Sequence, residues 1–134
     1  MNKLFKLLTV AMFIIVSGCS SDEPETENQT DPIIGVWYSW SDSGEEYSDC
    51  QKNSTLTFSS NGELIYKEFS ENATNNCVLS SEEMGTWLNE TENKYKLTIN
   101  GIPHTFYINF SNNNTIFKLY SDENDTQNYD EYRK

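Results

Sequence analysis

Positive charge is scarce in this sequence. Nine lysines and arginines stand against 21 aspartates and glutamates, which gives a formal net charge of −12. Proteins that bind nucleic acid neutralise phosphates with basic side chains, so this balance argues against a nucleic-acid partner. It argues equally against direct docking of the folded chain on an anionic membrane surface. An acidic excess of this kind mainly supports solubility.

Residues that commonly perform catalysis or bind metals are also few. His104 is the only histidine, and it follows Pro103 close to the turn signal Asn100-Gly101, so we expect it at a strand start facing solvent. No Gly-x-Ser-x-Gly nucleophile elbow occurs among the many serines. Two distant cysteines with one histidine do not make a zinc set. We therefore expect no catalytic residue, no metal and no cofactor.

Acidic residues gather in segments that resemble loops, at Glu45-Glu46, Glu82-Glu83 and Asp122-Glu123. A glycosidase needs two carboxylates that face each other at about 5–9 Å, a geometry that no sequence shows. A solvated surface is therefore the better interpretation. The acidic segment Ser121–Glu131 is rich in oxygen ligands but lacks the spacing and the glycine of an EF-hand loop. A weak calcium site there stays an open alternative.

A long apolar run is found only near the N-terminus. Leu7–Val16 is almost wholly apolar, follows Lys3 and Lys6, and precedes the small pair Ser17-Gly18. This order of charged, apolar and small residues is typical of a secretory signal peptide. The run is shorter than the roughly 20 residues that a transmembrane helix needs. The sequence therefore predicts export without a transmembrane anchor.

The segment Val16-Ser17-Gly18-Cys19 resembles the lipobox of bacterial lipoproteins. In that family the cysteine receives a diacylglycerol and becomes the first residue of the mature chain. The resemblance implies that residues 1–18 are a signal peptide and that Cys19 is acylated, with palmitate among the expected chains. A membrane would then be a partner through the anchor, because two acyl chains bind stably where one is marginal. An ordinary signal peptide with a chance cysteine is the alternative.

Residues 20–31, "SSDEPETENQTD", contain no large apolar side chain. Such a segment cannot bury enough surface to offset its ordering entropy, so residues 19–31 are predicted to be a lipidated, flexible tether. The acidic run resembles the signal by which some Gram-negative bacteria send lipoproteins to the outer face of the outer membrane; a plain spacer is equally open. We expect an outer-membrane lipoprotein, on the periplasmic face or the cell surface.

Cysteine usage fits an exported chain. Without residues 1–18, the balance is 7 basic against 21 acidic residues, a net charge of −14. If Cys19 is lipidated, Cys50 and Cys77 remain as an even pair. Paired cysteines in an exported protein predict a disulfide.

Residues 32–134 form one predicted domain, long enough for a single core. No segment after the signal has a helical period, whereas short alternating segments recur between turn signals such as Asn61-Gly62 and Asn100-Gly101. Eight or nine strands at this spacing indicate an all-β protein. Tight connections favour a single up-and-down antiparallel β-barrel of about eight strands, whose closure removes exposed edges. The expected strands are 33–40, 54–58, 63–69, 85–90, 94–99, 104–110, 115–120 and 127–134.

The order of short motifs is similar to that of the lipocalin-like domain of small bacterial lipoproteins, a calycin-type barrel. The motifs in order are Gly35-Val36-Trp37, Cys50, Leu56-Thr57-Phe58 with Asn61-Gly62, Cys77 and Gly85-Thr86-Trp87. In the lipocalin pattern the first-strand tryptophan packs at the closed end under an arginine from a late strand. The resemblance implies structural roles for Gly35, Trp37 and Arg133, with Arg133 stacked on Trp37. A solvated terminal arginine is the alternative.

Aromatic residues are the richest feature, with three tryptophans, eight tyrosines and seven phenylalanines. The candidate interior residues are Trp37, Phe58, Trp87, Tyr95, Leu97, Phe106, Ile108 and Phe110. They could line a site for a small apolar or amphipathic ligand, bound without catalysis. The alternative is a filled barrel that binds a protein or a glycan through its loops and through rim aromatics such as Tyr38, Trp40 and Tyr47.

Overall fold

The computed structural model describes residues 30–134. The predictions of a signal peptide, of lipidated Cys19 and of most of the tether lie outside the described residues. Within them, one short 3-10 turn, η1 (Gln51–Asn53), accompanies the strands. None of the described residues form a helix with the length and apolarity that crossing a bilayer needs.

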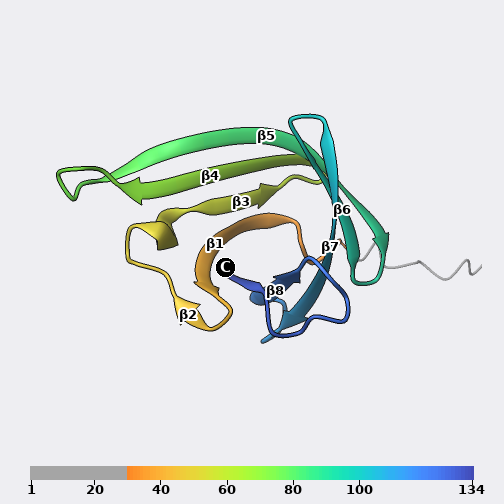
Figure 1. Ribbon diagram of the computed structural model, residues 1–134. Coiled ribbons are helices and arrows are strands. Elements are labelled where there is room, and N and C mark those ends of the chain that lie inside the picture. The colour runs from red at the N-terminus through yellow and green to blue at the C-terminus, as the bar shows by residue number, and fades with distance from the viewer. Residues whose placement is uncertain (1–29) are drawn as a thin grey trace, which may run out of the picture.

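The described chain is a closed antiparallel β-barrel (Figure 1). Eight strands form a sheet in the order β1-β3-β4-β5-β6-β7-β8-β9, and β9 pairs back onto β1. One further strand, the two-residue β2, pairs with the last residues of β1. The strands are β1 (Gly35–Asp42), β2 (Glu45–Glu46), β3 (Thr55–Phe58), β4 (Glu63–Glu71), β5 (Cys77–Thr91), β6 (Lys94–Ile99), β7 (Ile102–Ser111), β8 (Ile116–Tyr120) and β9 (Asp130–Arg133). The predicted all-β, up-and-down barrel is confirmed.

Most strands lie where alternation predicted them. The segment Lys94–Ile99 is β6 to the residue, because its buried and half-buried positions alternate cleanly. The turn pairs Asn61-Gly62 and Asn100-Gly101 connect β3 to β4 and β6 to β7. The largest difference is β5, which begins at Cys77 instead of Gly85. Residues 77–80 are exposed and show no apolar alternation, so the sequence contained no signal for them.

Glycine is required where the backbone is unusual or two strands approach closely. Gly35 opens β1 with φ +130°, a conformation that side chains of L-residues rarely adopt. Gly85 lies in β5 where β6 crosses close by, and a Cβ there would collide with the carbonyl of Thr98. Each glycine of the two Gly-x-Trp segments therefore has a backbone reason for its place.

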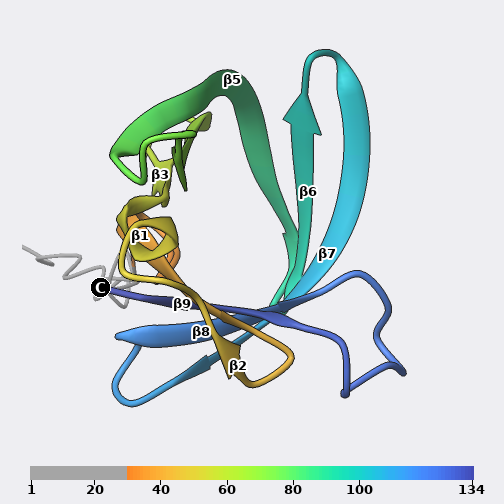
Figure 2. The same cartoon turned by 60° about the vertical axis from the view of Figure 1, so that its left-hand side comes forward.

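The connections divide the barrel into two ends, because consecutive antiparallel strands alternate direction. The chain enters β1 at the same end as the turns β3–β4, β5–β6 and β7–β8; we call this the closed end. Segment 43–54 with η1, the hairpins β4–β5 and β6–β7, and the loop β8–β9 lie at the other, the loop end. Figure 2 shows the β6–β7 hairpin extending away from the body of the barrel.

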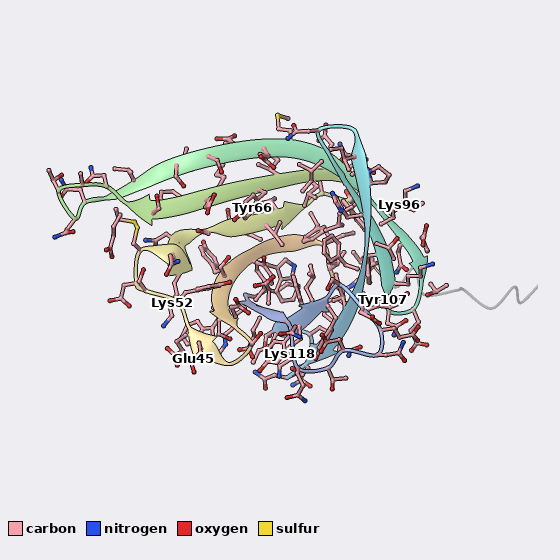
Figure 3. The ribbon with its side chains drawn as sticks, in the orientation of Figure 1. Glu45, Lys52, Tyr66, Lys96, Tyr107 and Lys118 are labelled. Carbon is pink, nitrogen blue, oxygen red and sulfur yellow. A yellow bond between two sulfur atoms is a disulfide. The ribbon has the colours of Figure 1, made fainter. Side chains whose placement is uncertain are left out.

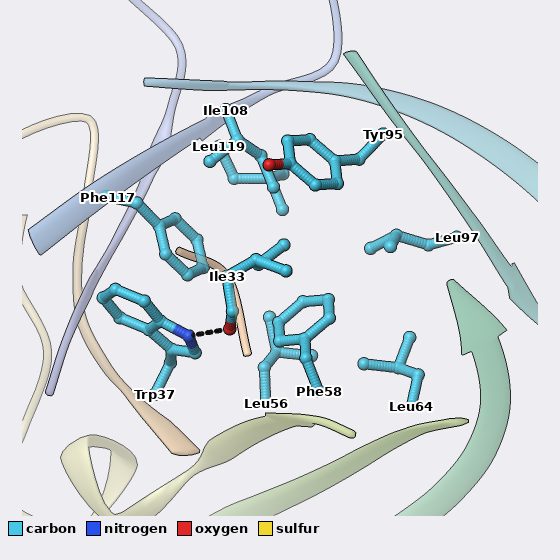
Figure 4. Close-up of a cluster of buried hydrophobic side chains, with 10 residues drawn as sticks. All are labelled: Ile33, Trp37, Leu56, Phe58, Leu64, Tyr95, Leu97, Ile108, Phe117 and Leu119. Carbon is cyan, nitrogen blue, oxygen red and sulfur yellow. Dashed lines mark hydrogen bonds between the residues drawn. The ribbon is translucent and has the colours of Figure 1, made fainter. Parts of the chain in front are cut away.

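A dense apolar core fills the closed end (Figure 4). Its ten residues are Ile33, Trp37, Leu56, Phe58, Leu64, Tyr95, Leu97, Ile108, Phe117 and Leu119. Trp37 donates its indole N–H to the carbonyl of Ile33 at 2.6 Å, so the segment before β1 is tied to the barrel floor. Asp31 Oδ1 accepts from the Tyr95 hydroxyl at 2.9 Å. The expected end of the tether thus takes part in closing the barrel.

Candidate functional site

A small polar pocket occupies the loop end of the barrel interior. It has a volume of about 220 Å³. The residues that define it are Ser39, Ser54, Tyr47, Tyr66, Asp130 and Tyr132. We treat it as the candidate site, since a pocket with convergent polar groups is the usual form of a ligand site.

The pocket follows from where apolar alternation stops along each strand. In β1, inward-facing Trp37 is followed two residues later by Ser39, which is 6% exposed. On the neighbouring strand Leu56 is preceded by Ser54, which is 4% exposed. In β4, buried Leu64 is followed at the next inward position by Tyr66. The same inward faces therefore change from apolar to polar on the way to the loop end.

The last strand adds the charged wall of the pocket. Phe117 of β8 pairs with Tyr132 of β9, and Leu119 pairs with Asp130. The ring of Tyr132 packs on that of Phe117 with centroids 4.9 Å apart, so it marks the border between the core and the pocket. Asp130 comes one inward step closer to the loop end.

Asp130 is held by a tyrosine from the segment after β1. The hydroxyl of Tyr47 donates to Asp130 Oδ1 at 2.9 Å. Burial raises the pKa of Asp130, and nearby Asp42 adds to the rise, although the hydrogen bond from Tyr47 opposes it. Burial of Tyr47, together with its hydrogen bond to Asp130 and the charge of that carboxylate, raises the pKa of Tyr47. The charged form of Asp130 therefore lacks compensation from a positive side chain in the pocket.

The remaining tyrosines keep their protons at neutral pH. Burial raises the pKa of Tyr66, and the carboxylates of Glu68, Asp130 and Glu83 raise it further. Burial also raises the pKa of Tyr132. A neutral phenol offers an O–H donor, an acceptor oxygen and an aromatic face. The pocket therefore combines hydrogen-bonding groups with ring surfaces.

The candidate interior residues of the sequence analysis lie at the closed end rather than around this pocket. Trp37, Phe58, Tyr95, Leu97 and Ile108 are buried in the core. The other three, Trp87, Phe106 and Phe110, are partly buried and packed against it. Ring contacts join several of them, and Trp37 lies 4.5 Å from Phe117 between centroids. These side chains fill the barrel floor, and their role in ligand binding stays a prediction.

A larger cleft, of about 880 Å³, lies at the closed end beside Asp31 and Tyr95. Ile108 and Phe110 also reach it. Of its two acidic groups, Asp31 is already engaged, because its carboxylate accepts from Tyr95, from the Asn89 amide at 2.7 Å and from the Ile33 backbone at 3.0 Å. The hydrogen bonds of Asp31 in this cleft therefore help to hold the segment before β1 against the barrel.

Arg133 does not stack on Trp37 as expected. Its guanidinium lies over the ring of Trp40 at 3.8 Å, and the cation over Trp37 is Lys134, at 4.4 Å. The reason is strand parity, since Arg133 pairs with outward-facing Tyr38 whereas Trp37 faces inward. Trp40 is also covered by Lys52 at 4.2 Å (Figure 3 labels Lys52).

The predicted rim aromatics are therefore separated. Trp40 is sandwiched by two cations, Tyr47 points at Asp130, and Tyr38 is 47% exposed on the outer face. They do not form one exposed aromatic surface. Sequence reasoning named Tyr47 but missed Tyr66, Asp130 and the pocket serines.

The predicted disulfide between Cys50 and Cys77 is confirmed, with a Cα–Cα distance of 5.3 Å. Cys50 immediately precedes η1 and Cys77 opens β5, so the bond ties two loop-end segments together (the yellow bond in Figure 3). It fixes the chain from which Gln51 and Ser54 reach the pocket.

Side chains that could bind a metal ion are dispersed in the described part of the chain. No set of three or more His, Cys, Asp or Glu side chains there is arranged to hold a metal ion. In the acidic segment after β8, Asp122 accepts from the Asn124 backbone, and Asp125 accepts from Gln127 and Asn128. These carboxylates shape turns. His104 is exposed on β7.

No protein-family model matches this chain, and no curated protein matches it either. The shown architecture is an eight-stranded closed antiparallel barrel, which is compatible with a lipocalin-like fold. The narrower resemblance to small bacterial lipoproteins stays a prediction from the motifs.

Proposed function

We propose that this chain is a non-catalytic binding protein whose barrel takes a small amphipathic molecule at its loop end. The observation that supports this most directly is the change from a filled apolar floor to a polar pocket of about 220 Å³. A barrel that served only as a scaffold would gain stability from apolar side chains at Ser39 and Asp130. Keeping polar groups there favours a ligand.

We also propose that the protein is anchored to the outer membrane by lipid on Cys19. The lipobox resemblance supports this. The end at which the chain enters the barrel also indicates which end of the barrel would face the membrane. The chain enters the barrel at the closed end, beside Asp31 and Ile33. An anchor attached there would leave the loop-end pocket on the side away from the membrane.

The second candidate is an interaction module that binds a protein or glycan partner. A row of outward residues crosses four strands in register, Val36 to Thr57, Ile65 and Met84. Val36 is 43% and Met84 66% exposed. An exposed apolar row of this kind favours contact with another molecule.

Native mass spectrometry of the full chain, exported to an oxidising compartment and purified in non-ionic detergent, separates these candidates. A ligand in the pocket predicts an added mass that leaves on denaturation. The matched control is Tyr66→Trp, which fills the pocket from β4 and should lose the added mass while keeping the barrel. A bare mass for the wild type, in a preparation never exposed to denaturant, favours the interaction module.

The anchor has its own test. Cys19→Ser should release the protein from the membrane fraction into the soluble fraction. Ser20→Cys in the same background should not restore anchoring, because the lipobox spacing is lost. Full membrane retention of Cys19→Ser would show the lipobox interpretation to be wrong.

A further inference from the structure

The charges around the loop-end pocket are unbalanced. Asp130 and Glu68 lie in its wall, and none of the described residues that line it is positively charged. Glu83 pairs with Tyr66 across β4 and β5, and its charge reaches the Tyr66 hydroxyl. Carboxylates in a partly enclosed site focus a negative potential into it.

Two basic side chains, Lys52 next to Gln51 and Arg133 next to Tyr132, are engaged elsewhere. Lys52 binds Glu46 at 2.7 Å and Arg133 binds Glu131 at 2.7 Å, and both cover Trp40. Strand parity puts this sandwich on the outer side of β1, away from Ser39 and the pocket. The barrel therefore does not use its own cations to neutralise the interior carboxylates.

The acceptors of the pocket carboxylates are only partly used. Asp130 accepts the Tyr47 hydroxyl, and Glu68 Oε2 accepts the Ser81 hydroxyl at 3.1 Å. An ionised carboxylate offers about four acceptor positions. Each of these two groups therefore has room for a charged donor from a ligand, and such charge-assisted hydrogen bonds are about twice as strong as neutral ones.

Three tyrosine rings surround the same space. Tyr47, Tyr66 and Tyr132 come from three different segments and all line the pocket. Aromatic faces attract ammonium groups, by about 0.5–2 kcal/mol depending on desolvation. Phe69 adds an apolar surface. Rings beside the half-buried carboxylate of Asp130, with Glu68 at the exposed side of the pocket, are surroundings that a protonated amine prefers.

We propose that the loop-end pocket selects a small organic cation, a primary amine attached to an apolar or aromatic group. The proposal rests on the proposed function, because it names the ligand class of the same site. The volume of about 220 Å³ is below the roughly 300–1,000 Å³ of sites for drug-sized molecules, so the ligand is small.

Three probes of matched shape test the charge preference: phenethylamine, 2-phenylethanol and 3-phenylpropionate. Each is titrated into the full chain in non-ionic detergent at pH 7, and the dissociation constant is measured by NMR of labelled tyrosines. We expect phenethylamine to bind at least about tenfold more tightly than the alcohol, as one charge-assisted hydrogen bond allows. The carboxylate probe should bind most weakly.

Two variants remove charge while keeping side-chain size, Asp130→Asn and Glu68→Gln. Each should weaken phenethylamine binding by about tenfold and leave 2-phenylethanol within about twofold. Glu82→Gln is the control, because Glu82 pairs with Lys67 at 3.6 Å outside the pocket. It removes the same charge and should change neither dissociation constant. Near-ultraviolet circular dichroism verifies that each variant keeps the wild-type packing.

The outcomes separate the two proposals. Equal binding of all three probes at Tyr66 and Tyr132 would overturn the cation preference and leave the proposed binding function standing. Equal weakening by Glu82→Gln and Asp130→Asn would also overturn it, since the effect would then come from overall charge. If no probe shifts any pocket tyrosine, the cation proposal fails, and native mass spectrometry alone decides the binding function.

Discussion

At the closed end of the barrel, Trp37, Phe58 and Phe117 are fully buried in one apolar cluster. At the loop end, inward positions on the same or adjoining strands hold Ser39 and Tyr132 instead. The strands run through both regions, with register shifts at the loop end between Ser39 and Ser41 and between Glu68 and Phe69, and the main difference lies in the side chains. Burial of apolar surface at about 25 cal/mol per Å² makes the first region the main source of stability.

The second region uses its inward positions for groups that weaken the fold. A buried carboxyl such as Asp130 raises the free energy of the folded state unless it is fully hydrogen-bonded. Proteins commonly accept such a loss where a binding site needs polar groups. The comparison teaches that stability and recognition are separated along the barrel axis, and the following substitutions test that separation.

The largest effect is expected from Trp37→Ala. Its ring is fully buried and its N–H bonds to Ile33, so removal should lower the free energy of unfolding by about 3–5 kcal/mol. Urea denaturation measures the change. The control is Tyr38→Ala on the outward face, with an expected effect within about 0.5 kcal/mol. Similar losses for both residues would show that the floor is not the stabilising region.

The disulfide comes next. Cys50 and Cys77 are separated by 27 residues, and closing a loop of this length contributes about 3–4 kcal/mol in the chain-entropy model. Replacing both by serine should lower the free energy of unfolding by that amount. Wild type unfolded under reducing conditions is the matched comparison and should behave alike. An unchanged urea midpoint would show that the disulfide does not contribute to the free energy of unfolding.

The next prediction is a pH effect: Asp130 is expected to make the folded protein less stable as the pH rises. Its pKa in the folded state is raised by burial, so the folded protein binds this proton more tightly than the unfolded chain does. The contribution of Asp130 to stability therefore falls as pH rises from about 4, the unfolded value, through the raised folded pKa. Asp130→Asn cannot titrate and should lose this slope.

Urea unfolding of wild type and Asp130→Asn across this pH range measures the difference in free energy at each pH. The difference should move in favour of the variant as pH rises. A flat difference would mean that Asp130 is as well solvated when folded as when unfolded. Glu71→Gln is the control, because it removes one exposed carboxylate at the end of β4 and should not change the pH dependence of stability in this way.

The smallest effect is expected from Met84→Ser. Met84 faces outward on β5 and is 66% exposed, so the free energy of unfolding should change by less than about 0.5 kcal/mol. Its neighbour in the sequence, Gly85, pairs with buried Leu64, and Leu64→Ala should cost about 2–5 kcal/mol. A large loss for Met84→Ser would indicate that the outward row is covered by another molecule.

The fold followed from local patterns, and the pocket did not. Alternation and turn pairs predicted the barrel because each strand records its own inward face, as Tyr95, Leu97 and Ile99 do in β6. The pocket depends on which strands become neighbours, and no local pattern brings Tyr47 to Asp130 across the whole domain. A usable signal was present at Ser39 and Ser54, polar residues two positions from core residues Trp37 and Leu56.

Parity explains the one misplaced contact. The sequence shows that Arg133 is the only arginine and belongs to the last strand, but not its pairing register with β1. A shift of one residue exchanges the two faces of a strand. Trp40 follows Tyr38 by two residues and shares its outward face, so the guanidinium of Arg133 lies over Trp40 and not over Trp37.

The pairing of β9 with β1 also governs when the barrel can form. This contact joins the first and last strands of the domain, so folding must close the longest loop available, which slows barrel formation. Until Arg133 has been synthesised, β1 and β8 both have an unpaired edge. A nascent chain therefore cannot close its barrel before its last strand, β9, has been synthesised, and until then it stays incompletely folded.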